Sequence, residues 1–287
     1  MTGRVAGAPI SWGVCEVPGW GYQIAADRVL AEMAQAGLVA TEFGPDGFLP
    51  ANLGARKDML HGYGLAAVGG FVPAVLHDPD RDPVAGIRAV LPSYLAAGAS
   101  TLVLAAATGL HGYEHRPALD ARGWRTLLSN MDRVAAVTAE AGISATLHPH
   151  VGTMVERPDE IDRVLDGAAI GLCLDTGHVL VGGGDPAELA GTAAGRIRHV
   201  HLKDVDAELA ARVRDGASSY RDAVAAGLYR PLGRGDASIA AIVSTLDAAG
   251  YAGWYVLEQD TVLAGEPPAG NGPLATVQES LAWLASR

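Results

Sequence analysis

The sequence has few of the features that mark secreted, membrane or nucleic-acid-binding proteins. Its 287 residues include only two cysteines, Cys15 and Cys173, so it has neither a disulfide framework nor a CxxC metal knuckle. No apolar run approaches the ~18 residues of a membrane span, and the N-terminus lacks a signal-peptide pattern. A formal net charge of −11 argues against a phosphate-backbone partner. We therefore expect a cytoplasmic protein with no membrane or nucleic-acid partner.

The chain is instead rich in short apolar runs that alternate with helical patterns. Hydrophobic residues make up 49% of the sequence and charged residues 18%, as in a compact globular protein. Strands are predicted over residues 9–13, 40–43, 65–72, 101–105, 144–148, 171–174, 198–202 and 254–258. Helical periodicity, mostly ended by glycine, predicts helices over residues 24–36, 53–63, 83–97, 124–141, 158–165, 186–193, 238–249 and 273–286.

Strict alternation of strands and helices predicts an α/β fold. Each strand then lies parallel to its neighbours through right-handed crossovers, and eight such units close as a (β/α)8 TIM barrel. A doubly wound open sheet is the alternative, but no GxGxxG motif follows the first strand. Residues 206–228 form the longest connection and contain helical stretches. Without a linker or a shift in composition, residues 1–287 are interpreted as one domain.

Polar side chains stand where four of the predicted strands end. The apolar run 171–174 leads directly into Asp175, and the other three strands deliver His148, His201 and Glu258. The carboxyl ends of barrel strands meet at one mouth, where the active sites of such barrels lie. Two neutral imidazoles and two carboxylates balance a divalent cation, and this mixed set suits Mn, Co, Zn or Fe better than Ca.

Further polar residues near these strand ends are candidates for chemistry. Lys203 could hold an oxyanion or move a proton. His150 could replace His148 as a ligand or contact the substrate, and His178 could contact the substrate or support a ligand. His199 shares a strand face with His201, one layer deeper, and is interpreted as structural. The candidate catalytic residues are Glu258, Lys203, His150 and His178.

Four residues are candidates for substrate contacts. Trp12 could form an apolar wall at the mouth, together with Trp20 and Phe43. Glu156 is either a hydrogen-bonding partner of the substrate or a helix-capping acid. The complete set of candidate substrate-binding residues is Trp12, Glu42, Glu156 and Arg234.

Several motifs make the chain resemble the xylose isomerase-like barrels, the sugar phosphate isomerase/epimerase superfamily. The strand-end motifs LDTGH (174–178) and HVHLKD (199–204) are shared across that superfamily. The runs TEFGPDGFLP (41–50) and HPHVGT (148–153) look most like its inosose dehydratase branch, and LGRGD (232–236) and EQD (258–260) also fit. The resemblance covers nearly the whole chain.

The resemblance implies a metal-dependent carbon–oxygen lyase of inositol catabolism, which removes water from a keto-inositol to give a cyclohexane dione. It implies Mn²⁺ or Co²⁺, with Zn²⁺ or Mg²⁺ as alternatives, held by the four strand-end residues. Barrels of this type commonly pair, so a homodimer is expected. Where this branch usually has Gly-Glu-Gly or Gly-Asp-Gly, this chain has Arg234 between two glycines, which could favour an acidic or phosphorylated substrate.

The residues also bear on the type of reaction. A ketose epimerase of this barrel type resembles a site with opposed carboxylates on strands five and eight, whereas strand five here ends in His148. One base and a Lewis acid suffice for elimination. A metal-dependent sugar or inosose isomerase/epimerase, acting through an enediolate, remains the alternative because histidine can also act as a base. A non-catalytic sugar-binding barrel and a DNA-repair nuclease fit less well, given the intact metal quartet and the acidic charge.

Overall fold

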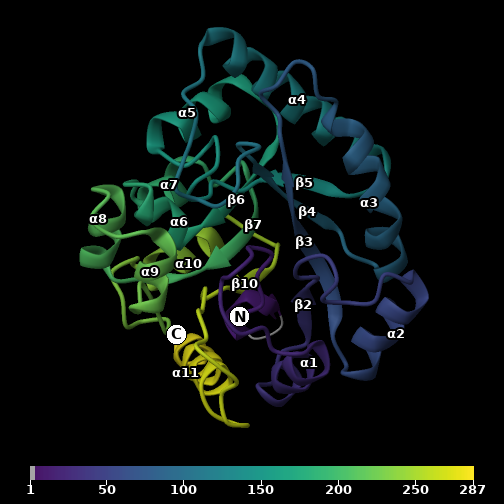
Figure 1. Ribbon diagram of the computed structural model, residues 1–287, viewed down its shortest axis with the longest axis vertical. Helices are drawn as coiled ribbons and strands as arrows, with labels where there is room; N and C mark the ends of the chain where they lie inside the picture. The colour runs from purple at the N-terminus through teal and green to yellow at the C-terminus, as the bar shows by residue number, and fades with distance from the viewer. Residues whose placement is uncertain (1–3) are drawn as a thin grey trace.

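The computed structural model describes residues 4–287, which form a closed barrel of parallel strands surrounded by helices (Figure 1). The order around the barrel is β1-β10-β7-β6-β5-β4-β3-β2. The barrel strands are β1 (Val5–Gly7), β2 (Ala40–Glu42), β3 (Ala66–Ala74), β4 (Thr101–Ala106), β5 (Ser144–Leu147), β6 (Gly171–Asp175), β7 (Ile197–Leu202) and β10 (Tyr255–Leu257). The predicted (β/α)8 barrel is confirmed.

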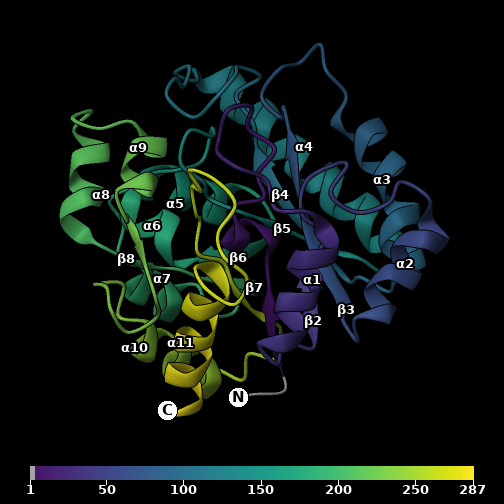
Figure 2. The same ribbon diagram turned by 60° about the horizontal axis from the view of Figure 1, so that its bottom comes forward.

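Helices cover the outside of the barrel, and a lobe made by α8 and α9 lies beside it in both Figure 1 and Figure 2. The short hairpin β8 (Asp204–Val205) and β9 (Tyr229–Arg230) connects this lobe to the barrel. No helix within residues 4–287 is both long and apolar enough to cross a membrane. The helices are η2 (Pro9–Trp12), α1 (Ala26–Gln35), α2 (Leu53–Gly62), α3 (Pro83–Ala97), α4 (Ala121–Glu140), α5 (Pro158–Gly167), α6 (Thr176–Val181), α7 (Pro186–Thr192), α8 (Ala207–Arg214), α9 (Tyr220–Ala225), α10 (Ile239–Ala248) and α11 (Pro273–Ala285).

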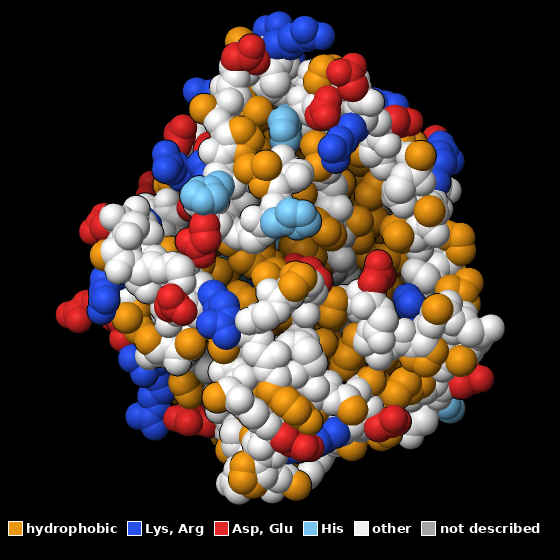
Figure 3. Space-filling view, viewed as in Figure 1, with side chains coloured by type: hydrophobic (Ala, Val, Ile, Leu, Met, Phe, Trp, Pro, Cys, Tyr) orange, Lys and Arg blue, Asp and Glu red, His pale blue; other side chains and the backbone are white. Residues whose placement is uncertain are grey.

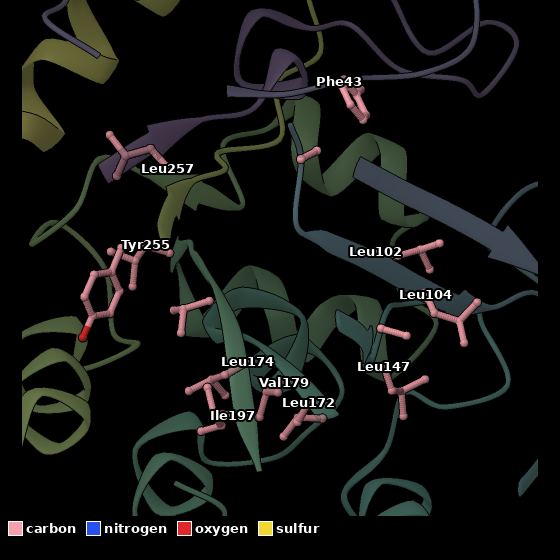
Figure 4. Packing of buried hydrophobic residues seen from close by; sticks show 14 of the residues in the cluster. Phe43, Leu102, Leu104, Leu147, Leu172, Leu174, Val179, Ile197, Tyr255 and Leu257 are labelled. Atoms are coloured by element: carbon pink, nitrogen blue, oxygen red, sulfur yellow. The ribbon is translucent and has the colours of Figure 1, made fainter. Parts of the chain in front are cut away.

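The strands are nearly continuous apolar runs because both of their faces are covered. Every residue of β4 is buried, since alternate side chains face the barrel interior and the surrounding helices. On the helix side, Leu172 and Leu174 of β6 belong to the same core as Val179 of α6 and Ile197 of β7, as Figure 4 shows. This packing fixes the strands and therefore the positions of the residues that follow them.

The first strand lies earlier in the chain than predicted. Residues 9–13 were predicted as a strand, but the strand is β1 and residues 9–12 form the 3-10 helix η2. Pro9 cannot donate a ladder hydrogen bond, and its fixed φ suits the first turn of a helix. Gly13 ends that turn with a φ of 79°. The prediction of a strand over residues 9–13 was therefore wrong.

A single buried carboxylate holds the loop between β9 and α10. Asp204 accepts hydrogen bonds from the backbone N–H groups of Gly233 at 2.8 Å, Gly235 at 3.0 Å and Ala237 at 3.0 Å. It also accepts one from the N–H of Val205. These bonds fix the loop against the barrel.

We expect Asp204→Ala to lower the free energy of unfolding by about 2–4 kcal/mol, because it leaves several loop N–H groups without partners. The neighbouring Asp206 is a control, since it caps the more exposed helix α8. Its replacement by alanine should cost about 1 kcal/mol. Urea denaturation measures both, and equal losses for the two variants would contradict the role given to Asp204.

Candidate metal centre and active site

Four strand ends bring two histidines and two carboxylates to one point inside the barrel mouth. His148 directly follows β5, Asp175 ends β6, His201 lies in β7, and Glu258 directly follows β10. One ligand atom from each lies within 4.8 Å of those from the other three; His148, Asp175 and His201 are buried, and the Glu258 side chain is only 12% exposed. The structure therefore brings together the four residues that the sequence predicted as ligands.

The ligand atoms of this quartet face one another. His148 Nε2 lies 3.1 Å and His201 Nδ1 lies 3.4 Å from Asp175 Oδ2. His201 Nδ1 also faces Glu258 Oε2, but within residues 4–287 neither of these two buried atoms makes a hydrogen bond. Buried polar atoms that make no hydrogen bond are costly unless an ion pair or a bound cation satisfies them. The quartet thus fits a divalent cation held by nitrogen and oxygen.

The charge states of the quartet suit this use. Burial raises the pKa of Asp175, but Lys203 and His178 outweigh it and hold that pKa well below its usual range. Burial likewise opposes ionisation of Glu258, yet His201 and Lys203 lower its pKa. Two ionised carboxylates therefore face the centre at neutral pH, as the ligands of a divalent cation must.

Asp175 also caps the helix that follows it. Its Oδ1 accepts hydrogen bonds from the backbone N–H groups of Gly177 at 2.9 Å and His178 at 2.8 Å, so it is the N-cap of α6. Its Oδ2 remains for the centre. The sequence suggested capping and ligation as alternative roles, and the two carboxylate oxygens can perform both.

Lys203 is buried beside the quartet and joins it to other acids. Its Nζ lies 2.7 Å from Asp260 Oδ1, 3.2 Å from Glu258 Oε2 and 3.3 Å from Asp175 Oδ2. Burial lowers the pKa of Lys203, but these carboxylates raise it well above its usual value. Gly177 allows this approach, because a Cβ there would lie 2.6 Å from Lys203 Cβ. An ammonium group is thus fixed at the centre.

Sequence reasoning missed the residues that hold Lys203 from the far side. Asp260 Oδ2 accepts a hydrogen bond from the Tyr220 hydroxyl at 2.6 Å, and Tyr220 also bonds the Tyr229 hydroxyl at 2.9 Å. The spacing of Asp260, two residues after Glu258, was an available signal for a shared face. No pattern pointed to Tyr220, which comes from the lobe formed by α8 and α9.

His150 and His178 stack on each other with ring centroids 3.8 Å apart. Burial lowers the pKa of both well below the usual value, so both imidazoles are neutral at pH 7. His150 Nδ1 lies 2.7 Å from the carbonyl oxygen of Val151, which can only accept, so Nδ1 carries the proton. His150 Nε2 then keeps a lone pair. On the other side of the stacked pair, His178 Nε2 lies 2.9 Å from Lys203 Nζ.

A cavity of about 400 Å³ opens above the quartet. Figure 3 shows a hollow lined largely by hydrophobic side chains, with acidic side chains at its edge. Polar groups of the lining include His148, His150, Lys203, Glu258 and Asp260. Apolar residues of the lining include Phe71, Val72, Pro73, Ala74, Pro83, Ile87 and Val90. Among the predicted wall residues, Trp20 lines this cavity.

The structure does not bring Trp12 or Phe43 to the cavity lining. The Trp12 indole N–H donates to Glu32 at 2.8 Å in the core between η2 and α1. This placement follows from the shift of the first strand to β1. Phe43 packs edge-on against Tyr94 of α3.

Glu156 and Arg234 also lie outside this cavity. Glu156 accepts a hydrogen bond from the Gly152 N–H at 2.8 Å and faces Arg116 at 3.4 Å, so it holds the loop after β5. The exposed Arg234 pairs with Glu279 of α11.

The last predicted substrate contact, Glu42, borders the cavity but is already engaged. Its side chain is buried, and its Oε1 faces the Nε2 atoms of His199 and His201. His199 lies one layer below His201, as strand parity indicated. Glu42 thus lies behind His201, one of the candidate metal ligands.

The sequence matches the family "Xylose isomerase-like TIM barrel" over residues 22–287, and the chain belongs to this family. The Rhizopine catabolism protein MocC of Rhizobium meliloti is 34% identical, with 91% of this chain and 82% of that protein covered. Inosose dehydratase of Geobacillus thermodenitrificans is 32% identical, with 90% of each covered. A D-allulose 3-epimerase from Methylomonas, solved with D-allulose, shares the fold at a TM-score of 0.69 and 18% identity, with 99% of this chain and 96% of that chain covered.

We expect Asp175→Asn to weaken metal binding by more than the roughly 10–100-fold typical of losing an outer partner of a metal ligand. The asparagine Oδ1 can still cap α6, so the variant should fold. Asp185→Asn is the matched control, because Asp185 caps α7 with the same pair of backbone bonds away from the quartet. Metal content after dialysis measures both, and one retained equivalent in Asp175→Asn would contradict the assignment.

Proposed function

We propose that this protein is a divalent-metal-dependent carbon–oxygen lyase that dehydrates a keto-inositol or a related keto-polyol in inositol catabolism. The observation that carries the proposal is the buried quartet of His148, Asp175, His201 and Glu258 at the floor of a cavity with a fixed ammonium group. Relatives named inosose dehydratase, about 32% identical over nearly the whole chain, support the choice of reaction. Mn²⁺ or Co²⁺ is the proposed metal, as the resemblance to the inosose dehydratase branch implies, and mixed nitrogen and oxygen donors suit either ion.

The cavity favours an uncharged substrate. Arg234 lies outside it, so the reason for expecting an acidic or phosphorylated substrate is removed. Lys203, the lysine in the cavity lining, is already surrounded by three carboxylates. Glu16 and Asp46 add further acidic groups to the lining. A phosphate would meet mainly negative charge there, whereas a neutral polyol would find hydrogen-bond acceptors.

The reaction breaks a C–H bond beside the ketone and a C–O bond on the next carbon, and it forms a C=C bond and water. When bound, the cation would supply Lewis-acid polarisation of the ketone. His150 Nε2 has the lone pair needed to take the proton from carbon, and Glu258 is the other base at the floor. Lys203 stabilises the negative oxygen that develops on the substrate. His178 contributes by fixing Lys203 and stacking under His150.

Proton NMR in deuterated water, with metal-loaded protein and 2-keto-myo-inositol, tests this function. We expect a product that has lost one water. The isomerase/epimerase alternative has its own support, because His150 and Glu258 are two separate proton acceptors in one cavity. It predicts deuterium uptake or a new stereoisomer without loss of water, and that result would overturn the lyase proposal.

The chain has two lysines, Lys203 in the site and the exposed Lys57 on α2, which gives a matched test. Lys203→Met should lower kcat about 10²–10³-fold, because it removes a preorganised charge from the developing oxyanion. Metal content should persist, since no ligand is lost. Lys57→Met should leave kcat unchanged. A Lys203→Met enzyme within a few fold of the parent would exclude this role.

A further inference from the structure

Glu42 joins two histidines of β7 across the barrel. It is the last residue of β2, and one of its oxygens, Oε1, lies 2.8 Å from His199 Nε2 and 3.0 Å from His201 Nε2. All three side chains are buried. The contact is therefore shielded from water, where hydrogen bonds to a charged group are strong.

These contacts fix which nitrogen of each ring carries the proton. An ionised carboxylate only accepts hydrogen bonds, so the Nε2 atoms of His199 and His201 are the donors. In neutral His201 the remaining lone pair is on Nδ1. That atom faces Asp175 Oδ2 at 3.4 Å and also faces Glu258.

We propose that Glu42 is a positioning residue, which sets the tautomer and orientation of His201 so that Nδ1 is the metal-binding atom. The inference rests on the metal centre of the proposed function, and it replaces the expected role of Glu42 as a substrate contact. A carboxylate behind a ligand histidine also makes the imidazole a stronger ligand. His199 supports this arrangement as the second donor, which holds the Glu42 carboxylate in place.

The cluster of Glu42, His199 and His201 is better explained by hydrogen bonds than by a second cation. A cation there would need His201 Nε2, which points at Glu42 Oε1 within hydrogen-bond distance. His201 would then have to bridge two metals through both nitrogens. Among residues 4–287, no further His, Cys, Asp or Glu side chain completes this group of three as a fourth metal ligand.

The test compares the metal affinity of two variants. In each, a carboxylate is replaced by the amide of the same size, so one negative charge is lost. Glu42→Gln keeps the size of the side chain but removes the charge that orients His201. Asp46→Asn makes the same change at another acid of the cavity lining. We expect Co²⁺ to bind about 10–100-fold more weakly to Glu42→Gln, measured by chelator competition, and its visible absorption spectrum to change. Asp46→Asn should bind Co²⁺ as the parent does.

A raised KM with unchanged Co²⁺ affinity in Glu42→Gln would make Glu42 a substrate contact and overturn the proposal. Should that variant fail to fold, nitrogen-15 NMR of the parent protein loaded with Zn²⁺ decides the question. We expect a proton on His201 Nε2 and none on Nδ1, and the opposite tautomer would overturn the proposal. Neither the Co²⁺ affinity nor the nitrogen-15 NMR spectrum needs turnover. An absence of dehydratase activity would therefore refute the proposed function, and these two measurements would still decide the role of Glu42.

Discussion

The burial of the Asp175 carboxylate is the constraint on which the rest of the site depends. A charge with no exposure to water is costly unless it is surrounded by hydrogen bonds and opposite charge. One oxygen is satisfied by the first turn of α6, and the other faces His148, His201 and Lys203. These partners come from the ends of β5 and β7, on either side of β6, so the three strands must pack together for the carboxylate to be stabilised. The fold and the centre therefore form together.

The sequence predicted the four strand-end residues of the site better than the residues that line the cavity above them. Short apolar runs that end in a polar residue were enough to predict the quartet, because the carboxyl ends of barrel strands meet at one mouth. Parity also showed that His199 shares a face with His201, but the partner of both, Glu42, lies across the barrel on β2. Sequence separation carries no signal for such a contact. The role of Glu42 therefore needed the structure.

The errors at the mouth have local causes. Trp12 was placed at a strand end because residues 9–13 alternate like a strand, although Pro9 starts a 3-10 helix there. Arg234 was placed at the mouth because its loop resembles a motif of the family, but its side chain pairs with Glu279 and does not line the cavity. The lobe of α8 and α9 supplies Tyr220 to the site through a long connection. Contacts made by loops depend on tertiary anchors, which short patterns do not contain.

The account stands on one claim, that the four strand-end residues hold a single divalent cation. Anomalous diffraction from a crystal soaked in Mn²⁺ or Co²⁺ tests it most directly. The account predicts one anomalous peak at roughly 2.0–2.3 Å from donor atoms of His148, Asp175, His201 and Glu258. A soaked crystal with no peak at these residues, or with a peak between Glu42 and His199 instead, would contradict it.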